Sequence, residues 1–242
     1  MKKIILCILL TVAILFGGFY IYVSDYYRTD TEAVEAFSPA TVIEERHLDG
    51  GSVAYVPEDA SAGVIFYPGG KVEYTAYEPL MVALAERGIL AVLVKMPFNL
   101  AVLKQNAADG IREQFDGIDS WYMAGHSLGG SMAASYISKN REDFDGLILL
   151  AAYSTADLSD SGLRVASVYG SEDGVMNREK YGEYMANLPT GTAQTVIDGG
   201  NHAYFGMYGE QKGDGEARIS ASAQITQTAE ILSHFISTSH GE

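Results

Sequence analysis

Short apolar runs that alternate with helical patterns constrain the fold of this chain more than any other feature of its sequence. The runs "ILAVLV" at 89–94 and "LILLAA" at 147–152 contain no polar positions, which is typical of strands buried on both faces. A helical pattern, "YEPLMVALAERG" at 77–88, stands directly before the first of them. The sequence therefore predicts an α/β fold, with a doubly wound, mostly parallel sheet and helices on both of its faces.

The same kind of pattern defines the remaining elements. The turn Asp49-Gly50-Gly51 predicts a hairpin early in the domain. Further strands are expected at 63–67, 121–125, 164–170 and 192–198, and further helices at 100–115, 128–139, 177–188 and 222–236. Because ligands bind beyond the carboxyl ends of the strands in such sheets, we expect the loops that follow the strands to carry the chemistry.

The first 23 residues differ from the rest of the chain. Lys2 and Lys3 precede an uncharged run from Ile4 to Val23, which is long enough to cross a hydrocarbon core of about 30 Å. The run ends in aromatic residues instead of the small residues of a cleavage site, so a retained signal anchor is favoured over a cleaved signal peptide. We expect a transmembrane segment at 1–23, a tether at 24–39 and one folded domain at 40–242.

Charge predicts the orientation of the chain and excludes one class of partner. Lys2 and Lys3 favour a cytoplasmic N-terminus, so the folded domain is expected outside the cell; a secreted form, made by signal cleavage, is the alternative. All 31 acidic side chains follow the apolar run, against 16 basic side chains in the whole chain. Such a surface repels nucleic acid and anionic lipid head groups, so nucleic acid is not an expected partner. The membrane is expected as a partner through the N-terminal helix alone. The oligomeric state is not predicted.

A G-x-S-x-G motif, Gly125 to Gly129, stands between a predicted strand and a predicted helix. A serine on so sharp a turn needs small neighbours, because side chains at Gly125 or Gly129 would collide with the adjoining strand or helix. The turn exposes the Ser127 hydroxyl and puts the N–H of Leu128 at a helix N-terminus, where it can stabilise an oxyanion. The motif alone also fits an ordinary glycine-rich turn, so its context decides the interpretation.

A nucleophilic serine requires a base that is itself oriented by an acid. In open-sheet hydrolases the chain order is serine, acid, histidine. Asp173 follows the strand at 164–170 and His202 follows the strand at 192–198, which agrees with that order. Glu172 is the alternative acid, and Asp173 also fits a simple turn cap.

The chain has four other histidines, and their positions make them weaker candidates for the base. They are His47, His126, His234 and His240. His47 lies before the nucleophile, and the last two lie in or beyond the final helix. His126 is expected to point away from the site, because neighbouring residues on an extended chain face opposite ways.

Two further features bear on how a substrate would be held. The loop "FYPGGK" predicts a second oxyanion donor, the main-chain N–H of either Gly70 or Lys71. Side chains expected to contact substrate are Tyr74, Tyr77, Phe98, Asn99, Tyr204 and Phe205, although core packing is the simpler interpretation of each. About ten residues separate the strands near 153 and 164, too few for a helical lid, so we expect an open site.

Six separated segments give the chain a resemblance to a known family. They are "FYPGG", "KMPFNLAVL", "GHSLGG", "LAAYSTADLSDSGL", "YGSEDG" and "GGNHAYFGMYG". From about residue 63 to 236 the chain resembles small, lidless bacterial serine hydrolases of the α/β-hydrolase superfamily, of the dienelactone-hydrolase-like kind. The resemblance implies that Ser127 is the nucleophile, Asp173 the acid and His202 the base. It departs from dienelactone hydrolases proper, which use cysteine, and from common esterases, which have His-Gly where this chain has Pro68-Gly69.

These observations together predict a carboxylesterase-like enzyme that cleaves small or medium acyl esters through an acyl-enzyme intermediate. Such chemistry needs no metal or organic cofactor, and the sequence shows no cluster with metal-ligand spacing. Thioesterase, amidase and lactone hydrolase activities use the same groups and are the alternatives. A non-catalytic surface binding protein is a further alternative, and it predicts that the Ser, Asp and His set is broken.

Overall fold

A single eight-stranded sheet forms the centre of the computed structural model, which describes residues 2–37 and 41–238. The strands are β1 (Glu44–His47), β2 (Val53–Val56), β3 (Ala62–Tyr67), β4 (Ile89–Leu93), β5 (Ser120–His126), β6 (Gly146–Leu150), β7 (Arg164–Gly170) and β8 (Ala193–Ile197). The α-helices are α1 (Lys2–Ser24), α2 (Thr31–Ala36), α3 (Glu78–Ala85), α4 (Leu128–Ile137), α5 (Arg178–Tyr184) and α6 (Ala221–Ser237).

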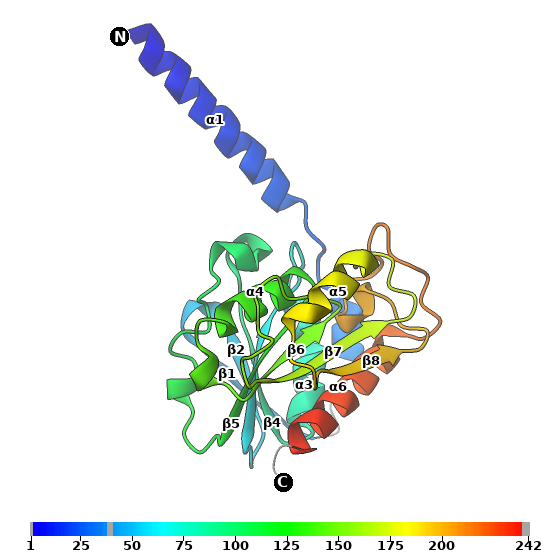
Figure 1. The fold of residues 1–242 in the computed structure, drawn as a ribbon. Helices are drawn as coiled ribbons and strands as arrows, with labels where there is room; N and C mark the ends of the chain where they lie inside the picture. The colour runs from blue at the N-terminus through cyan, green and yellow to red at the C-terminus, as the bar shows by residue number, and fades with distance from the viewer. Residues whose placement is uncertain (1, 38–40, 239–242) are drawn as a thin grey trace.

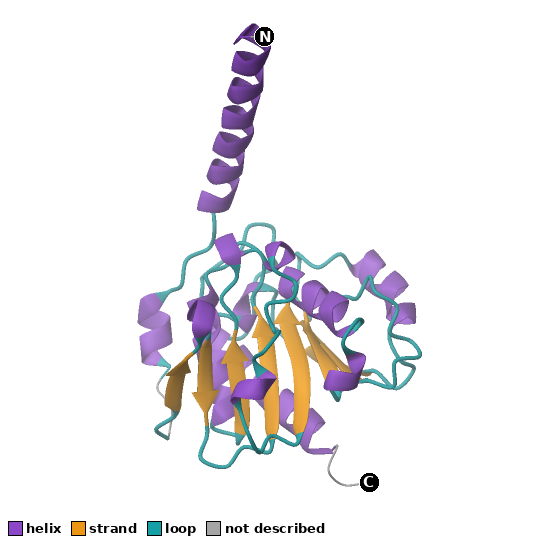
Figure 2. Cartoon of the chain, turned by 90° about the vertical axis from the view of Figure 1, so that its left-hand side faces the viewer, coloured by secondary structure: helices purple, strands orange, loops and turns teal. Residues whose placement is uncertain are grey.

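The order of the strands confirms the predicted mostly parallel sheet. In space they run β1-β2-β4-β3-β5-β6-β7-β8. Figure 1 and Figure 2 show the sheet at the centre of the domain, with helices packed around it. The β1–β2 and β2–β4 pairs are antiparallel, and the five pairs from β4 to β8 are parallel. The predicted hairpin joins β1 to β2, with Gly50 at φ 79° and Gly51 at φ 82°, a conformation that glycine adopts without a steric penalty. The carboxyl ends of the parallel strands therefore share one edge of the sheet.

Two layers of apolar side chains bury the sheet from its two faces. On β3, all six residues are buried, and Ile65 and Phe66 belong to opposite layers because successive side chains on a strand point to opposite faces. Helices α3 and α6 cover the Phe66 face, whereas α4 covers the Ile65 face. Each fully buried side chain of this size contributes about 1.5–3 kcal/mol, so these layers hold the strand ends at fixed positions.

The helix predicted at 100–115 is absent, and this prediction was wrong. Residues 100–115 instead form short 3₁₀ turns, η4 (Ala101–Leu103) and η5 (Arg112–Gln114), with hydrogen bonds that span three residues. The Tyr67 hydroxyl accepts a hydrogen bond from the Ala108 N–H at 2.9 Å, and a positive φ at Gly110 interrupts the chain two residues later. An α-helix requires hydrogen bonds between residues four apart, and both features prevent that pattern in this segment.

The N-terminal helix α1 extends away from the sheet at the edge where the parallel strands end (Figure 1). Within the part of the chain that the structure describes, Lys3–Ser24 is the one helix long and apolar enough to cross a membrane, judged by length and composition. The segment predicted as a tether does not hang free: Tyr27 forms a parallel bridge with Val72, and Phe37 packs on the core. The domain boundaries at 23 and 39 remain predictions.

Candidate active site

Ser127 lies at the turn between β5 and α4, where its backbone is strained. Its φ is 51° and its ψ is −121°, which is rare for a residue with a side chain and typical of a nucleophile elbow. The Ser127 N–H donates to the Leu150 carbonyl at 2.9 Å, which attaches the turn to the neighbouring strand β6. The side chain is partly exposed, whereas every residue of β5 before it is buried.

The glycines around Ser127 allow three chain segments to meet. A Cβ at Gly125 would stand 2.6 Å from the main chain of Gly129 and Gly130. A Cβ at Gly129 would overlap the carbonyl groups of Tyr67 and Pro68 at the end of β3. The predicted collisions with the adjoining strand and helix are therefore present, and any larger residue would displace the elbow.

Asp173 and His202 form a buried pair beyond the ends of β7 and β8. His202 Nδ1 and Asp173 Oδ2 are 2.9 Å apart, and the two side chains are 1% and 0% exposed. Asp173 Oδ1 accepts hydrogen bonds from the N–H groups of Val175 and Met176 at 2.9 and 2.8 Å. Burial raises the pKa of Asp173, but the hydrogen bonds from His202 and from the two N–H groups outweigh it, so the net pKa is lower than usual.

An ionised Asp173 fixes the tautomer of His202. The Nδ1 position carries the proton and donates to the carboxylate, which leaves Nε2 as the acceptor. His202 Nε2 is buried and has no hydrogen-bond partner among the described residues. This is the atom that a base of this kind uses to take a proton.

The alternative acids and bases lie elsewhere. Glu172 binds the exposed Arg218 and the Ser171 hydroxyl, and these contacts lower its pKa. His47 is exposed on β1 and His234 lies on α6, while His240 falls outside the described residues. Among the described candidates, only Asp173 and His202 contact each other in the predicted way.

His126 contradicts its predicted direction. Its ring lies 4.6 Å from the ring of His202, centroid to centroid, so it packs against the site instead of pointing away. The alternation rule holds between extended residues, and Ser127 is not extended. Burial, and to a smaller degree the neighbouring His202, lower the pKa of His126 well below its usual value, so the ring is neutral at pH 7.

Tyr77 connects His126 to the loop after β3. Its hydroxyl lies 2.8 Å from His126 Nδ1 and accepts a hydrogen bond from the Gly69 N–H at 3.1 Å. Gly70 follows directly and lies against the residue after Ser127, because a Cβ at Gly70 would stand 2.7 Å from Leu128 Cδ2. The loop is thus held beside the N-terminus of α4.

The two predicted oxyanion donors of this loop differ in whether their main-chain N–H group already makes a hydrogen bond. The Lys71 N–H already donates to the Asn99 carbonyl at 2.8 Å, whereas the Gly70 N–H has no partner among the described residues. The contact with Asn99 joins the loop after β3 to the loop after β4.

Two residues that the sequence did not single out hold the loops that carry Asp173 and His202. Asp214 Oδ1 accepts hydrogen bonds from the N–H groups of Gly174 and His202 at 3.0 and 3.2 Å. Gln224 of α6, fully buried, binds both the N–H and the carbonyl of Asn201 at 2.9 and 2.8 Å. An aspartate between two glycines, "KGDGE", was the one available signal for Asp214.

The side chains predicted to contact substrate divide into two groups. Tyr77 and Phe205 are fully buried and support the site from within the core. The other four are more accessible: Tyr74 lies beneath the Lys95 ammonium group, Phe98 is 58% exposed, Asn99 offers its carbonyl to Lys71, and Tyr204 packs at the edge of the core. Residues 151–163, which connect β6 to β7, contain no helix, as the absence of a lid requires.

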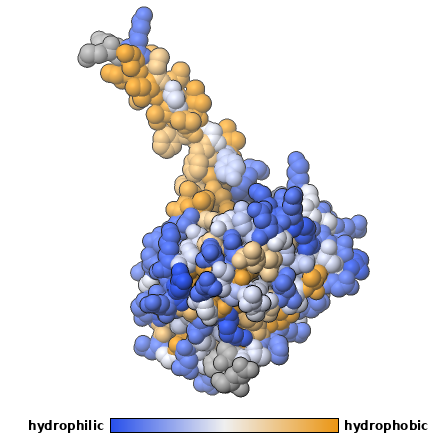
Figure 3. All heavy atoms as spheres, viewed as in Figure 1, coloured by the Kyte–Doolittle hydropathy of each residue, from blue (hydrophilic) through white to orange (hydrophobic). Residues whose placement is uncertain are grey.

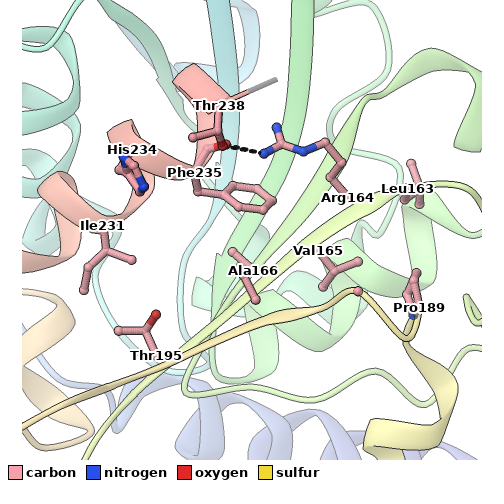
Figure 4. A pocket seen from close by; sticks show the side chains of 12 residues that line it. Leu163, Arg164, Val165, Ala166, Pro189, Thr195, Ile231, His234, Phe235 and Thr238 are labelled. Atoms are coloured by element: carbon pink, nitrogen blue, oxygen red, sulfur yellow. Dashed lines mark hydrogen bonds between the residues drawn. The ribbon is translucent and has the colours of Figure 1, made fainter. Parts of the chain in front are cut away.

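A cavity of about 510 Å³ lies at the opposite edge of the sheet (Figure 4). It is lined by the first residues of β7 and β8 and by α6, and it contains His234. Arg164 is bonded there to Thr238 Oγ1 at 2.9 Å, and the lining includes no serine, cysteine or carboxylate. The cavity thus contains His234 without a carboxylate to orient it. No cluster of three or more potential metal ligands is found in residues 2–37 and 41–238.

A serine after β5, an acid after β7 and a histidine after β8 follow the chain order of α/β-fold hydrolases. The chain belongs to the alpha/beta hydrolase family, whose sequence model matches residues 63–226. None of the curated proteins compared with the chain is significantly similar to it.

Solved structures with the same fold are numerous and distant in sequence. The chain is similar to a CIB-like hydrolase from Thermoplasma acidophilum, with a TM-score of 0.56 and 16% identity over 80% of this chain and 99% of that one. It is similar to a dienelactone hydrolase from Anabaena variabilis, with a TM-score of 0.59 and 13% identity over 81% and 98%. A monoglyceride lipase from Saccharomyces cerevisiae gives a TM-score of 0.57 and 11% identity over 82% and 97%. At these identities the likeness supports the fold alone.

Proposed function

We propose that this protein is a serine hydrolase that cleaves small or medium acyl esters, with Ser127 as nucleophile, His202 as base and Asp173 as orienting acid. The observation that carries the proposal is the buried hydrogen bond between His202 Nδ1 and Asp173 Oδ2, at 2.9 Å. The His202 ring lies 4.6 Å from the ring of His126, which directly precedes the strained Ser127. A binding protein has no use for a strained serine beside a buried, oriented imidazole, so this alternative is weaker.

In the first half of the reaction, the Ser127 hydroxyl oxygen bonds to the ester carbonyl carbon while His202 Nε2 takes the hydroxyl proton. The tetrahedral intermediate collapses, the carbon–oxygen bond to the alcohol breaks, and the imidazolium returns its proton to the departing alcohol. Water then attacks the acyl-serine by the same route and releases the acid. Asp173 stabilises the imidazolium throughout without taking the proton.

The intermediate oxygen is stabilised by the N–H groups of Leu128 and Gly70. Leu128 is the first residue of α4, where the helix dipole adds to its hydrogen bond. Lys71 is the weaker of the two predicted loop donors, because its N–H is engaged with Asn99. Thioesters, amides and lactones pass through the same intermediate, and no contact in the structure favours one of them.

The proposal includes a location. The apolar helix Lys3–Ser24 would anchor the domain in the cell membrane with the domain outside, since Lys2 and Lys3 favour a cytoplasmic N-terminus. Protease added to intact cells should then remove the domain, and protection of the domain would contradict this orientation.

Labelling with a serine-directed fluorophosphonate tests the enzymatic proposal. Wild type should gain one phosphonyl group and Ser127→Ala none. Ser131→Ala is a matched control one turn along α4, where the hydroxyl donates to the Tyr153 carbonyl, and it should label like wild type. A panel of esters with graded acyl chains, assayed beside the label, would define the substrate. Folded wild type that does not label would overturn the proposal.

A further inference from the structure

The end of α1 is attached to the loops that surround the active site. The Phe19 ring packs edge-on against Phe98, with centroids 5.5 Å apart. The Lys71 ammonium group lies 4.7 Å from the centroid of the Tyr22 ring and forms an ion pair with Asp25 at 2.9 Å. The last turns of the helix therefore rest on the loops after β3 and β4.

The chain that follows α1 prevents the helix from moving far from this position. The Tyr27 N–H donates to the Lys71 carbonyl at 2.8 Å, and the Glu73 N–H donates to the Tyr27 carbonyl at 2.9 Å. The Thr29 N–H then donates to the Glu73 carboxylate at 3.0 Å. Two residues separate Ser24, the end of the helix, from Tyr27, so the helix is joined to the domain by a short link.

The length of α1 defines how deep these loops would lie. Its 22 candidate spanning residues cover roughly 33 Å, close to the thickness of about 30 Å of a hydrocarbon core. Phe19 lies five residues before the end of the helix, about 7 Å inward. Because the helix exceeds the core by only about 3 Å, Phe19 and the Phe98 ring that contacts it lie about 6 Å inside the hydrocarbon boundary. Tyr22, two residues from the end of the helix, lies close to that boundary, where aromatic and lysine side chains such as Tyr22 and Lys71 are favoured.

The loop at this level is unusually apolar for a protein surface. Outside α1, five large hydrophobic side chains of the described residues are exposed, and three of them belong to this loop: Phe98 at 58%, Val102 at 49% and Leu103 at 48%. Figure 3 shows the apolar surface of α1 and the end of the domain where this helix joins it. Exposed apolar groups gathered beside a membrane helix are typical of a surface that partitions into the interface.

The same loop is continuous with the catalytic groups. The Asn99 carbonyl binds the Lys71 N–H, and Lys71 follows Gly70, which lies against Leu128 beside the nucleophile. Lys71 also contacts Tyr22 of α1, so a single residue, Lys71, connects the helix to Gly70, the proposed oxyanion donor.

We infer that the active-site edge of this protein faces the lipid bilayer, and that its substrate is a medium-chain acyl ester dissolved in the membrane interface. The inference rests on the serine hydrolase function proposed above. The loop 97–103 enters the interface, and the ester reaches Ser127 from the lipid side with its acyl chain still in the apolar phase. A substrate delivered from water would gain nothing from this apolar loop.

Depth-dependent quenching tests the orientation without any need for activity. Full-length Val102→Trp and Val42→Trp are reconstituted in phosphatidylcholine vesicles that contain brominated lipid. Val42 is a matched control: it is an exposed valine two residues before β1, at the opposite edge of the sheet, and the native Trp121 is buried and common to both variants. Quenching at position 102 and none at 42 is expected.

Phe16→Trp, inside α1, reports whether the helix itself is inserted. Quenching at 16 without quenching at 102 would overturn the inference even if the enzyme is active. No quenching at 16 would overturn it together with the anchor.

Kinetics test the substrate class. In the same vesicles, Val102→Glu with Leu103→Glu should slow hydrolysis of 4-methylumbelliferyl decanoate about tenfold, a loss of about 1.4 kcal/mol of interfacial binding, and leave the water-soluble acetate ester unaffected. Val42→Glu should change neither rate. Equal losses on both esters, or no loss on the decanoate, would contradict the inference. If wild type cleaves neither ester, the proposed function fails, while the quenching result still decides the orientation.

Discussion

The two edges of the parallel sheet differ in how they bear backbone strain. All five non-glycine residues with positive φ in the described chain lie just beyond the carboxyl ends of β3 to β6: Lys71, Phe98, Asn99, Ser127 and Ala151. At the amino edge, positive φ occurs at glycines that precede strands, such as Gly88, Gly117 and Gly162. Strained conformations cost about 1–3 kcal/mol each and persist where the surrounding structure enforces them.

The largest cavity described above and the proposed catalytic residues lie at opposite edges of the sheet. The amino edge has the cavity with His234, whose lining includes no carboxylate, and its positive-φ turns are formed by glycines. The carboxyl edge concentrates strain, a buried acid–histidine pair and the end of α1. Strain and an oriented imidazole thus coincide at the edge of the proposed active site, whereas the 510 Å³ cavity lies at the other edge.

The largest expected difference between the two edges is in the loss of catalytic activity, and Asp173→Asn at the carboxyl edge should cause it. An amide cannot hold His202 in the tautomer with a free Nε2, so kcat/KM should fall by about 10⁴. His234→Ala, at the amino edge, should leave kcat/KM unchanged. Ester hydrolysis measured beside thermal unfolding checks both, and a folded Asp173→Asn within tenfold of wild type would remove Asp173 from its proposed role.

The second effect concerns the oxyanion loop. The added methyl of Gly70→Ala would stand 2.7 Å from Leu128 Cδ2 and displace the loop, so kcat should fall by about 10²–10³ with little change in KM. Gly191→Ala is the control, because nothing lies within 4 Å of its added Cβ at the rim of the opposite cavity. Comparable losses in the two variants would argue against a special position for Gly70.

The third effect compares two carboxylates that bind main-chain N–H groups, Asp214 between loops and Asp145 at the start of a strand. Asp214→Ala should lower stability by about 1–3 kcal/mol and kcat by up to about 10², because the acid and base loops separate. Asp145 binds the Trp121 N–H at 2.8 Å at the amino edge, so Asp145→Ala should lose stability alone. Denaturant unfolding and kcat, measured on both variants, distinguish the cases; a kcat loss in Asp145→Ala would weaken the contrast between the edges.

The smallest expected effect is a dependence of the free energy of unfolding on pH. Since the pKa of Asp173 is lowered by folding, its contribution to stability is present above the unfolded value near 3.9 and is lost as pH falls through the lower folded value. The stability difference between wild type and Asp173→Asn should therefore narrow on acidification below about pH 4. Unfolding measured across that range checks the sign, and a difference that widens would contradict it.

Much of the fold was predictable because a strand that is buried on both faces consists of consecutive apolar residues, a pattern that the sequence itself displays. Each short apolar run of the folded domain became a strand, and the loops after β7 and β8 brought Asp173 to His202. The segment at 100–115 was mispredicted because a distant hydroxyl, that of Tyr67, binds its main chain. The direction of His126 was mispredicted because the strained backbone of Ser127 breaks the alternation of side chains along an extended chain. Asp214 was missed because its hydrogen bonds join loops that are far apart in the sequence and have no regular pattern.

The bonds from Gln224 to Asn201 have a consequence for biosynthesis. Translation delivers α1 first, then Ser127, then the base loop, and α6 last among these elements. Until Gln224 has emerged from the ribosome, the segment that carries His202 lacks the two bonds that hold its main chain. If α1 anchors the chain as proposed, the helix leaves the ribosome and can enter the membrane before the segment that carries His202 is held by Gln224.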